Sequence, residues 1–197
     1  DENASASGHE YFNVGDLAIS PSQELAAYTV DTTGGERYEL RFRDLATGAD
    51  RDDVVPDVYY GLAWANDDRT ILFTRPDETM RPWQVWRHTL GTPASDDVLV
   101  YQEDDDRFFV AVSRARTGLL LTITSASKVT SEVRVLDANA SDAEPVPVEP
   151  REQGHEYHVE HHSGPSGDRL FVLTNRDGDE NFSLHVTPLA TPGRAYW

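Results

Sequence analysis

A short apolar strand, a polar turn and a strand of alternating apolar and charged residues follow one another four times along the chain. The alternating strands are centred on Leu40, Val85, Val133 and Leu184, so the repeat length is about 45 to 51 residues. Alternation with a period of two is typical of a strand with one buried face. Repeats of this length are typical of propeller blades, each of which is a small four-stranded sheet.

The repeats predict an all-β protein, a β-propeller fragment of about four four-stranded blades. The predicted blades cover residues 11–53, 54–103, 104–150 and 151–197. Glycine and proline recur at the joints, and Pro145, Pro147 and Pro150 indicate an extended crossing between two blades. The sequence contains no convincing amphipathic helix of ten or more residues and no linker long enough to separate two domains.

The composition is acidic and lacks cysteine. A formal net charge of −18 disfavours nucleic acid and anionic membrane surfaces, whereas basic peptides would be attracted. The simpler interpretation, which we favour, is that the carboxylates keep the surface hydrated. There is no apolar run long enough to span a membrane, and residues 1–10 have none of the features of a signal peptide. With no cysteine, neither disulfides nor thiolate metal sites are possible, and we expect a reducing, cytoplasmic location.

Serine, histidine and aspartate are all present, but no motif assembles them into a hydrolase triad. The G-x-S-x-G nucleophile elbow is absent, and the nearest string, GPSG at residues 164–167, has the wrong spacing and is expected to form a turn. No phosphate-binding loop or dinucleotide fingerprint occurs either, so no cofactor is expected.

Four histidines gather in residues 154–162. On a strand, one face would carry His155, Tyr157, Val159 and His161, and the other His158, Glu160 and His162. His158 and His162 would lie about 13 Å apart, too far to bind one ion together. Alternate histidines could bind a metal only with a ligand from a neighbouring strand, so we expect structural or surface roles and no metal site.

Each of two acidic stretches could bind a ligand, but each is explained more simply as a turn or a loop. Asp177, Asp179 and Asn181 resemble the start of a calcium loop, but Phe182 and Pro188 stand where that loop needs glycine and glutamate. A hairpin turn explains this stretch better. Residues 103–106 are four consecutive acids, which we interpret as a solvated loop between strands; the alternative is a site for a basic ligand.

Several strings resemble the propeller domain of oligopeptidase B, a trypsin-like branch of the prolyl oligopeptidase family of serine peptidases. They occur in the family's order and cover nearly the whole chain. They are RPWQVWRH at 81–88 with LGTPAS at 90–95, GHEYF at 8–12, RFRDL at 41–45, SAS at 125–127 with TSEVR at 130–134, and NF at 181–182.

The resemblance implies a two-domain enzyme in which a seven-bladed propeller covers an α/β-hydrolase domain that carries the Ser-Asp-His triad. Its substrates would be short peptides cleaved after Arg or Lys, and the propeller would limit and gate their access. This chain would correspond to about blades two to five, and its partner would be the hydrolase domain of the same parent chain. No catalytic residue can be assigned, so the chain alone should be inactive.

The resemblance also implies salt bridges between propeller and hydrolase near the hinge. Glu10 and Arg37 are the candidates on the propeller side, with an ordinary surface role as the alternative, and their partners would lie outside this chain. A function of another class stays open, a stand-alone propeller that binds partner proteins. An arc of blades would also leave two blade faces uncovered, so we expect the isolated chain to self-associate.

Overall fold

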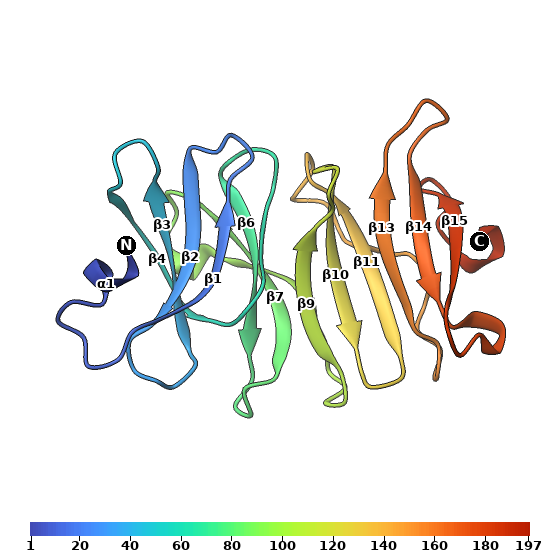
Figure 1. The fold of residues 1–197 in the computed structure, drawn as a ribbon, viewed down its shortest axis with the longest axis horizontal. Helices are drawn as coiled ribbons and strands as arrows, with labels where there is room; N and C mark the ends of the chain where they lie inside the picture. The colour runs from blue at the N-terminus through green and yellow to red at the C-terminus, as the bar shows by residue number, and fades with distance from the viewer.

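The structure, a computed structural model, describes residues 1–197 and consists of four antiparallel sheets that follow one another along the chain (Figure 1). The strands of the first sheet are β1 (Asn13–Ile19), β2 (Leu25–Asp31), β3 (Tyr38–Asp44) and β4 (Asp50–Val58). Those of the second are β5 (Leu62–Trp64), β6 (Thr70–Pro76), β7 (Pro82–Thr89) and β8 (Val98–Gln102). Strand β4 therefore extends past residue 53, where the repeat spacing placed the first boundary.

The third sheet contains β9 (Phe109–Arg114), β10 (Leu120–Ala126), β11 (Ser131–Asp137) and β12 (Val146–Pro147). The fourth contains β13 (Tyr157–His162), β14 (Arg169–Thr174) and β15 (Ser183–Pro188). Helical segments are short: α1 (Glu2–Ser5), η1 (Ala94–Asp96), η2 (Arg176–Gly178) and η3 (Arg194–Tyr196). No helix is both long and apolar enough to cross a membrane.

Each sheet is a meander in which sequential strands pair, as in a propeller blade. The sheets stand side by side in chain order, with the first at the left of Figure 1 and the fourth at the right, so the two termini lie at opposite ends. The predicted all-β arc of blades is confirmed. The fourth sheet departs from the four-stranded pattern: it has three strands, and the residues after β15 form η3.

The second strand of each of the first three sheets is buried more completely than alternation predicts. In β6 every residue except Arg75 is buried, because this strand lies between two strands of its own sheet and between two neighbouring sheets. Strand β3 alternates as predicted, since Leu40 and Phe42 are buried while Glu39 is exposed. Central strands that are buried on both faces have nearly continuous apolar sequences. Strands nearer the edge of a sheet have alternating apolar and polar residues.

Three apolar cores fill the spaces between successive sheets. Trp64 lies in the first core, where it meets Phe42 edge-on at 5.7 Å between ring centroids, and its indole Nε1 donates a hydrogen bond of 3.0 Å to the carbonyl of Ala18. The second core is built around Leu121 and the third around Tyr157. Each blade is therefore stabilised mainly by the blade next to it.

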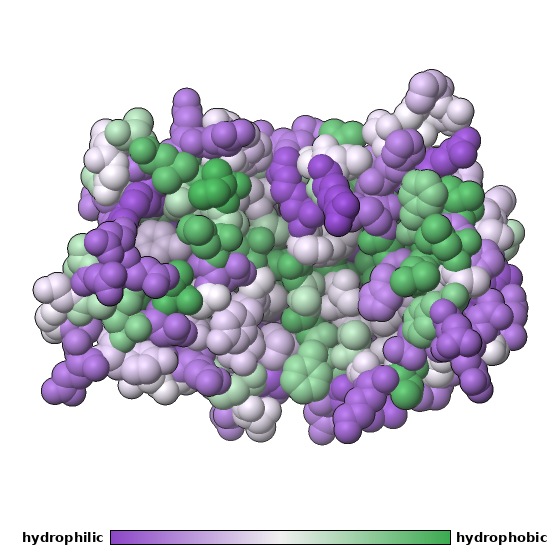
Figure 2. Space-filling model, viewed as in Figure 1, coloured by the Kyte–Doolittle hydropathy of each residue, from purple (hydrophilic) through white to green (hydrophobic).

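No further blade covers the outer face of the first or the fourth sheet, although α1 lines a pocket with Leu17 and Tyr28 on the first. On the first sheet Leu17 is 60 % exposed. On the fourth sheet the cross-strand pairs Phe171–Val186 and Leu173–Leu184 place four apolar side chains on the open face, and Leu184 is 66 % exposed. Figure 2 shows apolar side chains gathered over this sheet. The two uncovered blade faces predicted for an open arc are present.

Candidate functional site

Polar and charged side chains collect at the edge where β1, β9 and β13 begin, which is the lower edge in Figure 1. Both predicted hinge residues lie in segments at this edge: Glu10 precedes β1, and Arg37 precedes β3. The aromatic ring of Tyr11 lies beside Gly34, so the segment that carries Glu10 passes next to the turn that leads to Arg37. Gly34 has a positive φ of 77°, which glycine adopts at little cost.

Glu10 and Arg37 differ in what they bind. The exposed side chain of Glu10 makes no ion pair or hydrogen bond within the chain. Arg37 ion pairs with Asp57 of the first sheet, and its Nη2 donates to the carbonyl of Asp77, in the β6–β7 connection of the second sheet, at 3.0 Å. The structure therefore gives Arg37 a partner inside the propeller, at the joint between two blades, and leaves Glu10 free.

Arg81 is the centre of a buried clamp at the same edge. Its Nη1 donates to the carbonyl oxygens of Glu103, Asp105 and Phe108 at 3.3, 3.0 and 2.9 Å. Its Nε donates to Asp77 at 2.9 Å. Burial alone would raise the pKa of Asp77, but hydrogen bonds from Thr79 and Arg81 lower it to about 2. One guanidinium thus fixes the connection from the second sheet to the third.

The acidic run 103–106 is not a uniformly solvated loop, and that prediction is wrong for Glu103. Only 5 % of Glu103 is exposed, and its carboxylate accepts hydrogen bonds from Ser125 Oγ at 2.5 Å and Tyr101 Oη at 3.0 Å and ion pairs with Arg151. Asp104 and Asp106 are exposed, as expected. A buried carboxylate requires charged and hydrogen-bonding partners, and here the chain's own arginine takes the place of a basic ligand.

Glu103 and Arg151 could have been found from the repeat spacing. Glu103 ends the second predicted repeat and Arg151 begins the fourth, so both lie in the connections that flank the third repeat. Connections at corresponding positions of successive blades meet at one edge, and opposite charges there are candidates for a pair. The burial of the two side chains could not be predicted from the residues next to them. It depends on Phe108, whose ring centroid lies 3.6 Å from the Arg151 guanidinium.

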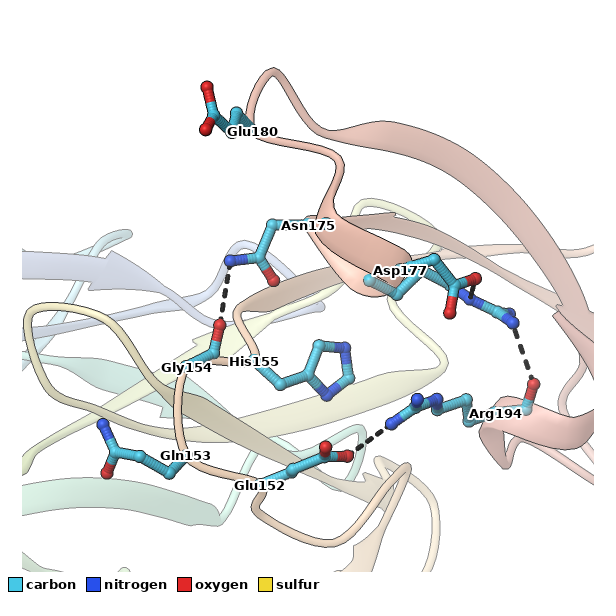
Figure 3. Close-up of a pocket in the computed structure, with 10 residues that line it drawn as sticks. Glu152, Gln153, Gly154, His155, Asn175, Asp177, Glu180 and Arg194 are labelled. Atoms are coloured by element: carbon cyan, nitrogen blue, oxygen red, sulfur yellow. Dashed lines mark hydrogen bonds and ion pairs between the residues drawn. The ribbon is translucent and has the colours of Figure 1, made fainter.

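A polar pocket of about 280 Å³ lies at this edge in the fourth sheet (Figure 3). Four of its five charged lining residues form two ion pairs, Arg194 with Glu152 and Arg176 with Asp177, and Glu180 forms none. The His155 imidazole stands between these pairs, with Nε2 2.9 Å from the Thr174 hydroxyl. Burial lowers the pKa of His155, and the nearby Arg194 lowers it further. The site therefore disfavours the charged form of His155.

A larger pocket of about 550 Å³ adjoins the polar one, and Gln153 lines both. Its apolar lining comes from Phe108 and Phe109 before and at the start of β9, and from Ala126 and Val129 around the β10–β11 turn. Phe109 is 55 % exposed and Val129 50 % exposed. Lys128 and Arg107 complete its rim.

The histidine segment has the predicted alternation. Tyr157 and His161 are buried, while His158 and His162 are exposed on the other face of β13. His161 Nδ1 lies 2.6 Å from the Thr117 hydroxyl, which gives this histidine a structural role between the third and fourth sheets. No group of three or more histidine, aspartate or glutamate residues is placed to hold a metal ion.

The calcium-like stretch forms part of the connection between β14 and β15. Asp177 lies in η2 with a positive φ of 59° and ion pairs with Arg176. Gly164 and Gly167 close the turn between β13 and β14 through a backbone hydrogen bond of 2.9 Å. Both stretches are turns, as their sequences predict.

The fold and this edge define a propeller domain, and comparison with known proteins gives its family. The N-terminal β-propeller domain of prolyl oligopeptidase matches residues 1–197, and the chain belongs to this family. It is 39 % identical to dipeptidyl aminopeptidase BI of Pseudoxanthomonas mexicana over 100 % of this chain and 27 % of that protein. It is 35 % identical to Protease 2 of Moraxella lacunata over 96 % of this chain and 27 % of that protein.

Comparison with solved structures supports the same family. Oligopeptidase B of Leishmania major superposes with a TM-score of 0.88 at 32 % identity, covering 98 % of this chain and 27 % of that one. Oligopeptidase B of Trypanosoma brucei, with covalently bound antipain in a closed form, gives a TM-score of 0.86 at 36 % identity, covering 98 % of this chain and 26 % of that one. The chain therefore spans about a quarter of the length of these relatives.

Proposed function

We propose that this chain is the non-catalytic propeller portion of an oligopeptidase B-like serine peptidase, whose triad lies in an α/β-hydrolase domain of the same parent chain. The observation that carries the proposal is the match of nearly the whole chain to oligopeptidase B structures at 32 and 36 % identity. The chain itself has no nucleophile elbow, so it frames the reaction without taking part in the bond chemistry.

The proposed substrates are short peptides cleaved after Arg or Lys, and the proposed location is the cytoplasm. The net charge of −18 supports basic substrates, because an acidic surface raises the local concentration of cationic peptides. Access would be limited by the propeller and gated by opening between propeller and hydrolase. A rigid propeller suits this role, and the buried arginine clamps at the joints between blades provide that rigidity.

Glu10 and Arg37 are the proposed propeller-side contacts at the hinge. Glu10 is supported by its exposed carboxylate, which has no partner within the chain. Arg37 would have to share or exchange its bond to Asp57 when it meets the hydrolase domain. In the full-length enzyme, Glu10→Gln should therefore change domain opening more than Arg37→Gln does, as measured by small-angle scattering with and without inhibitor.

The test is an assay of the full-length protein on blocked peptide amides that end in Arg, Lys or Pro before the reporter group. We expect turnover after Arg and Lys that a serine-directed covalent inhibitor abolishes, and no turnover by the isolated 197-residue chain. Inhibitor-sensitive cleavage by the purified isolated chain would contradict the assignment of catalysis to another domain.

A dipeptidyl aminopeptidase activity is the second candidate for the parent enzyme, and it is supported by the 39 % identity to dipeptidyl aminopeptidase BI. Such an activity would release dipeptides from a free N-terminus. Unblocked and N-acetylated versions of one chromogenic dipeptide distinguish the two candidates, because only an aminopeptidase requires the free amine.

A further inference from the structure

The larger pocket at the lower edge is formed by the end of the third sheet and one tight turn. Phe109 and Ala126, which both line it, are the last pair of the β9–β10 ladder. The β10–β11 turn is closed by a hydrogen bond of 2.8 Å from the backbone N–H of Ser127 to the carbonyl of Thr130. The pocket volume of about 550 Å³ lies within the usual range of ligand pockets. The lining is therefore in place before any ligand binds, which reduces the entropy cost of binding.

Phe108 is the buried member of this lining, and two arginines fix its position. Its carbonyl accepts a hydrogen bond of 2.9 Å from Arg81 Nη1, and its ring centroid lies 3.6 Å from the Arg151 guanidinium. In contrast, about half of Phe109 and of Val129 is exposed, and neither side chain contributes to the three apolar cores. Exposed apolar side chains gathered on a fixed base are typical of an interaction surface.

The charged side chains that line this pocket are both cationic, Arg107 and Lys128. Their sign is opposite to that of the chain, which has 35 Asp and Glu residues against 17 Lys and Arg. Asp105 neutralises Arg107, whereas Lys128 is exposed and makes no ion pair or side-chain hydrogen bond. The neighbouring Asp104 and Asp106 do not line the pocket. By charge complementarity, a carboxylate is therefore the favoured ligand group beside Lys128.

Gln153 adds an uncharged polar group to the same rim. Its exposed side chain makes no hydrogen bond within the chain, so the amide is free to donate to a carboxylate or to accept from a peptide N–H. An apolar lining beside Lys128 and Gln153 suits a residue that carries an apolar side chain and a carboxylate on one Cα atom. Only the C-terminal residue of a peptide has both groups.

We propose that this pocket binds the C-terminal residue of a short peptide, with its apolar side chain against Phe109 and Val129 and its α-carboxylate beside Lys128. The inference rests on the proposed function for the class of ligand, since short peptides are the proposed substrates. A basic residue elsewhere in the peptide is compatible with this binding, because only the last residue enters the pocket. The other possible occupant, a segment of the parent chain outside these 197 residues, is an outcome of the test.

The test uses the full-length protein, treated with a serine-directed covalent inhibitor so that the catalytic cleft is blocked. The probes are the peptide Gly-Ser-Gly-Phe with a free carboxylate and the same peptide as its C-terminal amide, each with a dye at the N-terminus, and binding is read by fluorescence anisotropy. We expect saturable binding, with the acid bound about threefold more tightly than the amide, which is the effect of one exposed charge pair. Phe109→Ser should weaken the binding of both peptides about tenfold, which corresponds to about 1.4 kcal/mol.

Lys128→Ala separates the contribution of charge from that of packing. It should abolish the preference for the acid and leave the affinity for the amide unchanged. Arg116→Ala is the matched control, since Arg116 is an exposed cation without an ion pair in the β9–β10 turn, at the opposite edge of the same sheet. Val146→Ser is the control for Phe109→Ser, because it removes an apolar side chain that is 56 % exposed. Neither control should change the binding of either peptide.

Equal affinity for the acid and the amide would overturn the inference, and so would peptide binding that Phe109→Ser leaves unchanged. A third contrary result is a Phe109→Cys variant that a thiol reagent fails to label at this position in the full-length protein, because another part of the parent chain would then cover the pocket. The expected binding pattern in a protein without peptidase activity would refute the proposed function and leave the pocket assignment intact. Peptidase activity without this pattern would do the reverse.

Discussion

Arg151, which precedes β13, ion pairs with Glu103, which follows β8, so one buried pair joins the two connections that flank the third sheet. The Arg151 guanidinium also covers the ring of Phe108 at 3.6 Å and donates to Ser125 Oγ at 3.0 Å. Carboxylate, hydroxyl and ring come from different parts of the second and third repeats. The pair therefore fixes three consecutive blades relative to one another.

Replacing Glu103 by Gln should lower the free energy of unfolding by about 3 kcal/mol, because it leaves the Arg151 charge without its partner in a largely dry site. Urea unfolding followed by tryptophan fluorescence measures this. Asp104→Asn is the control in the same loop, since Asp104 is exposed and its replacement should change stability by no more than about 0.5 kcal/mol. Equal effects of the two variants would show that the buried pair does not stabilise the fold.

The stability of the chain should fall in acid as Glu103 takes up a proton. Burial alone would raise the pKa of Glu103, but hydrogen bonds from Arg151 and Ser125 lower it from 4.5 to about 2. Because the folded pKa lies below the unfolded one, the stabilisation is complete above pH 4.5 and is lost as the pH falls from 4.5 toward 2, by roughly 3 kcal/mol.

Urea midpoints measured at intervals from pH 6 to pH 2 test this dependence. Glu103→Gln should give a shallower acid slope, with a remainder from Asp77, whose pKa is also lowered to about 2. A slope that the substitution leaves unchanged would assign the acid sensitivity to other carboxylates.

Arg81→Lys should destabilise the connection between the second and third sheets by about 2 kcal/mol. A lysine ammonium cannot reproduce the planar fork that reaches three carbonyl oxygens and the Asp77 carboxylate together. Amide hydrogen exchange should become faster in residues 103–108. The exposed Arg107 of the same connection provides the control, and Arg107→Lys should leave the exchange rates unchanged.

Gly15→Ala should cost about 1–3 kcal/mol, because an added Cβ would lie 2.5 Å from the buried Tyr38 ring and 2.8 Å from Thr29 Oγ1. Gly193→Ala is the matched control, since its Cβ would meet only Glu149 Oε2 at 3.5 Å. Thermal unfolding of both variants measures the difference. A destabilised Gly193→Ala with an unaffected Gly15→Ala would contradict the packing of Tyr38 against β1.

The isolated chain should self-associate through its two uncovered end faces, as apolar surfaces of this kind favour association. Multi-angle light scattering should show a mass that increases with concentration. Leu17→Asp combined with Leu184→Asp should restore the monomer, because these side chains are 60 and 66 % exposed on the two faces. Val146→Asp, exposed on the third sheet, should not. A monomer at all concentrations without any substitution would contradict the prediction.

Much of the fold follows from local pattern. The alternation around Leu40 and the repeat of this pattern at Val85, Val133 and Leu184 place all four on the third strands of consecutive sheets. The faces of β13 also follow from alternation alone, as His158 and His161 show. Side chains on a strand point to opposite faces in turn, so local order in the sequence directly predicts which ones share a face.

The burial and pairing of the charged side chains at the site could not be predicted in the same way, because they depend on contacts between blades. In the sequence, Glu103 is one of four consecutive acids, and its burial comes from Arg151 and Phe108, which approach it only when the blades stack. Likewise, the sequence alone suggests that Arg37 is an unpaired surface charge. In the fold, it ion pairs with Asp57 and donates to the carbonyl of Asp77.

The sequence by itself determined the all-β architecture, the number of repeats and the absence of a nucleophile elbow, because strand periodicity and motifs are local properties. The tertiary structure decided which charges are buried, where the two pockets adjoin at Gln153, and which apolar faces stay open. These properties depend on residues about one repeat apart in the chain, and only the stacking of blades brings such residues into contact.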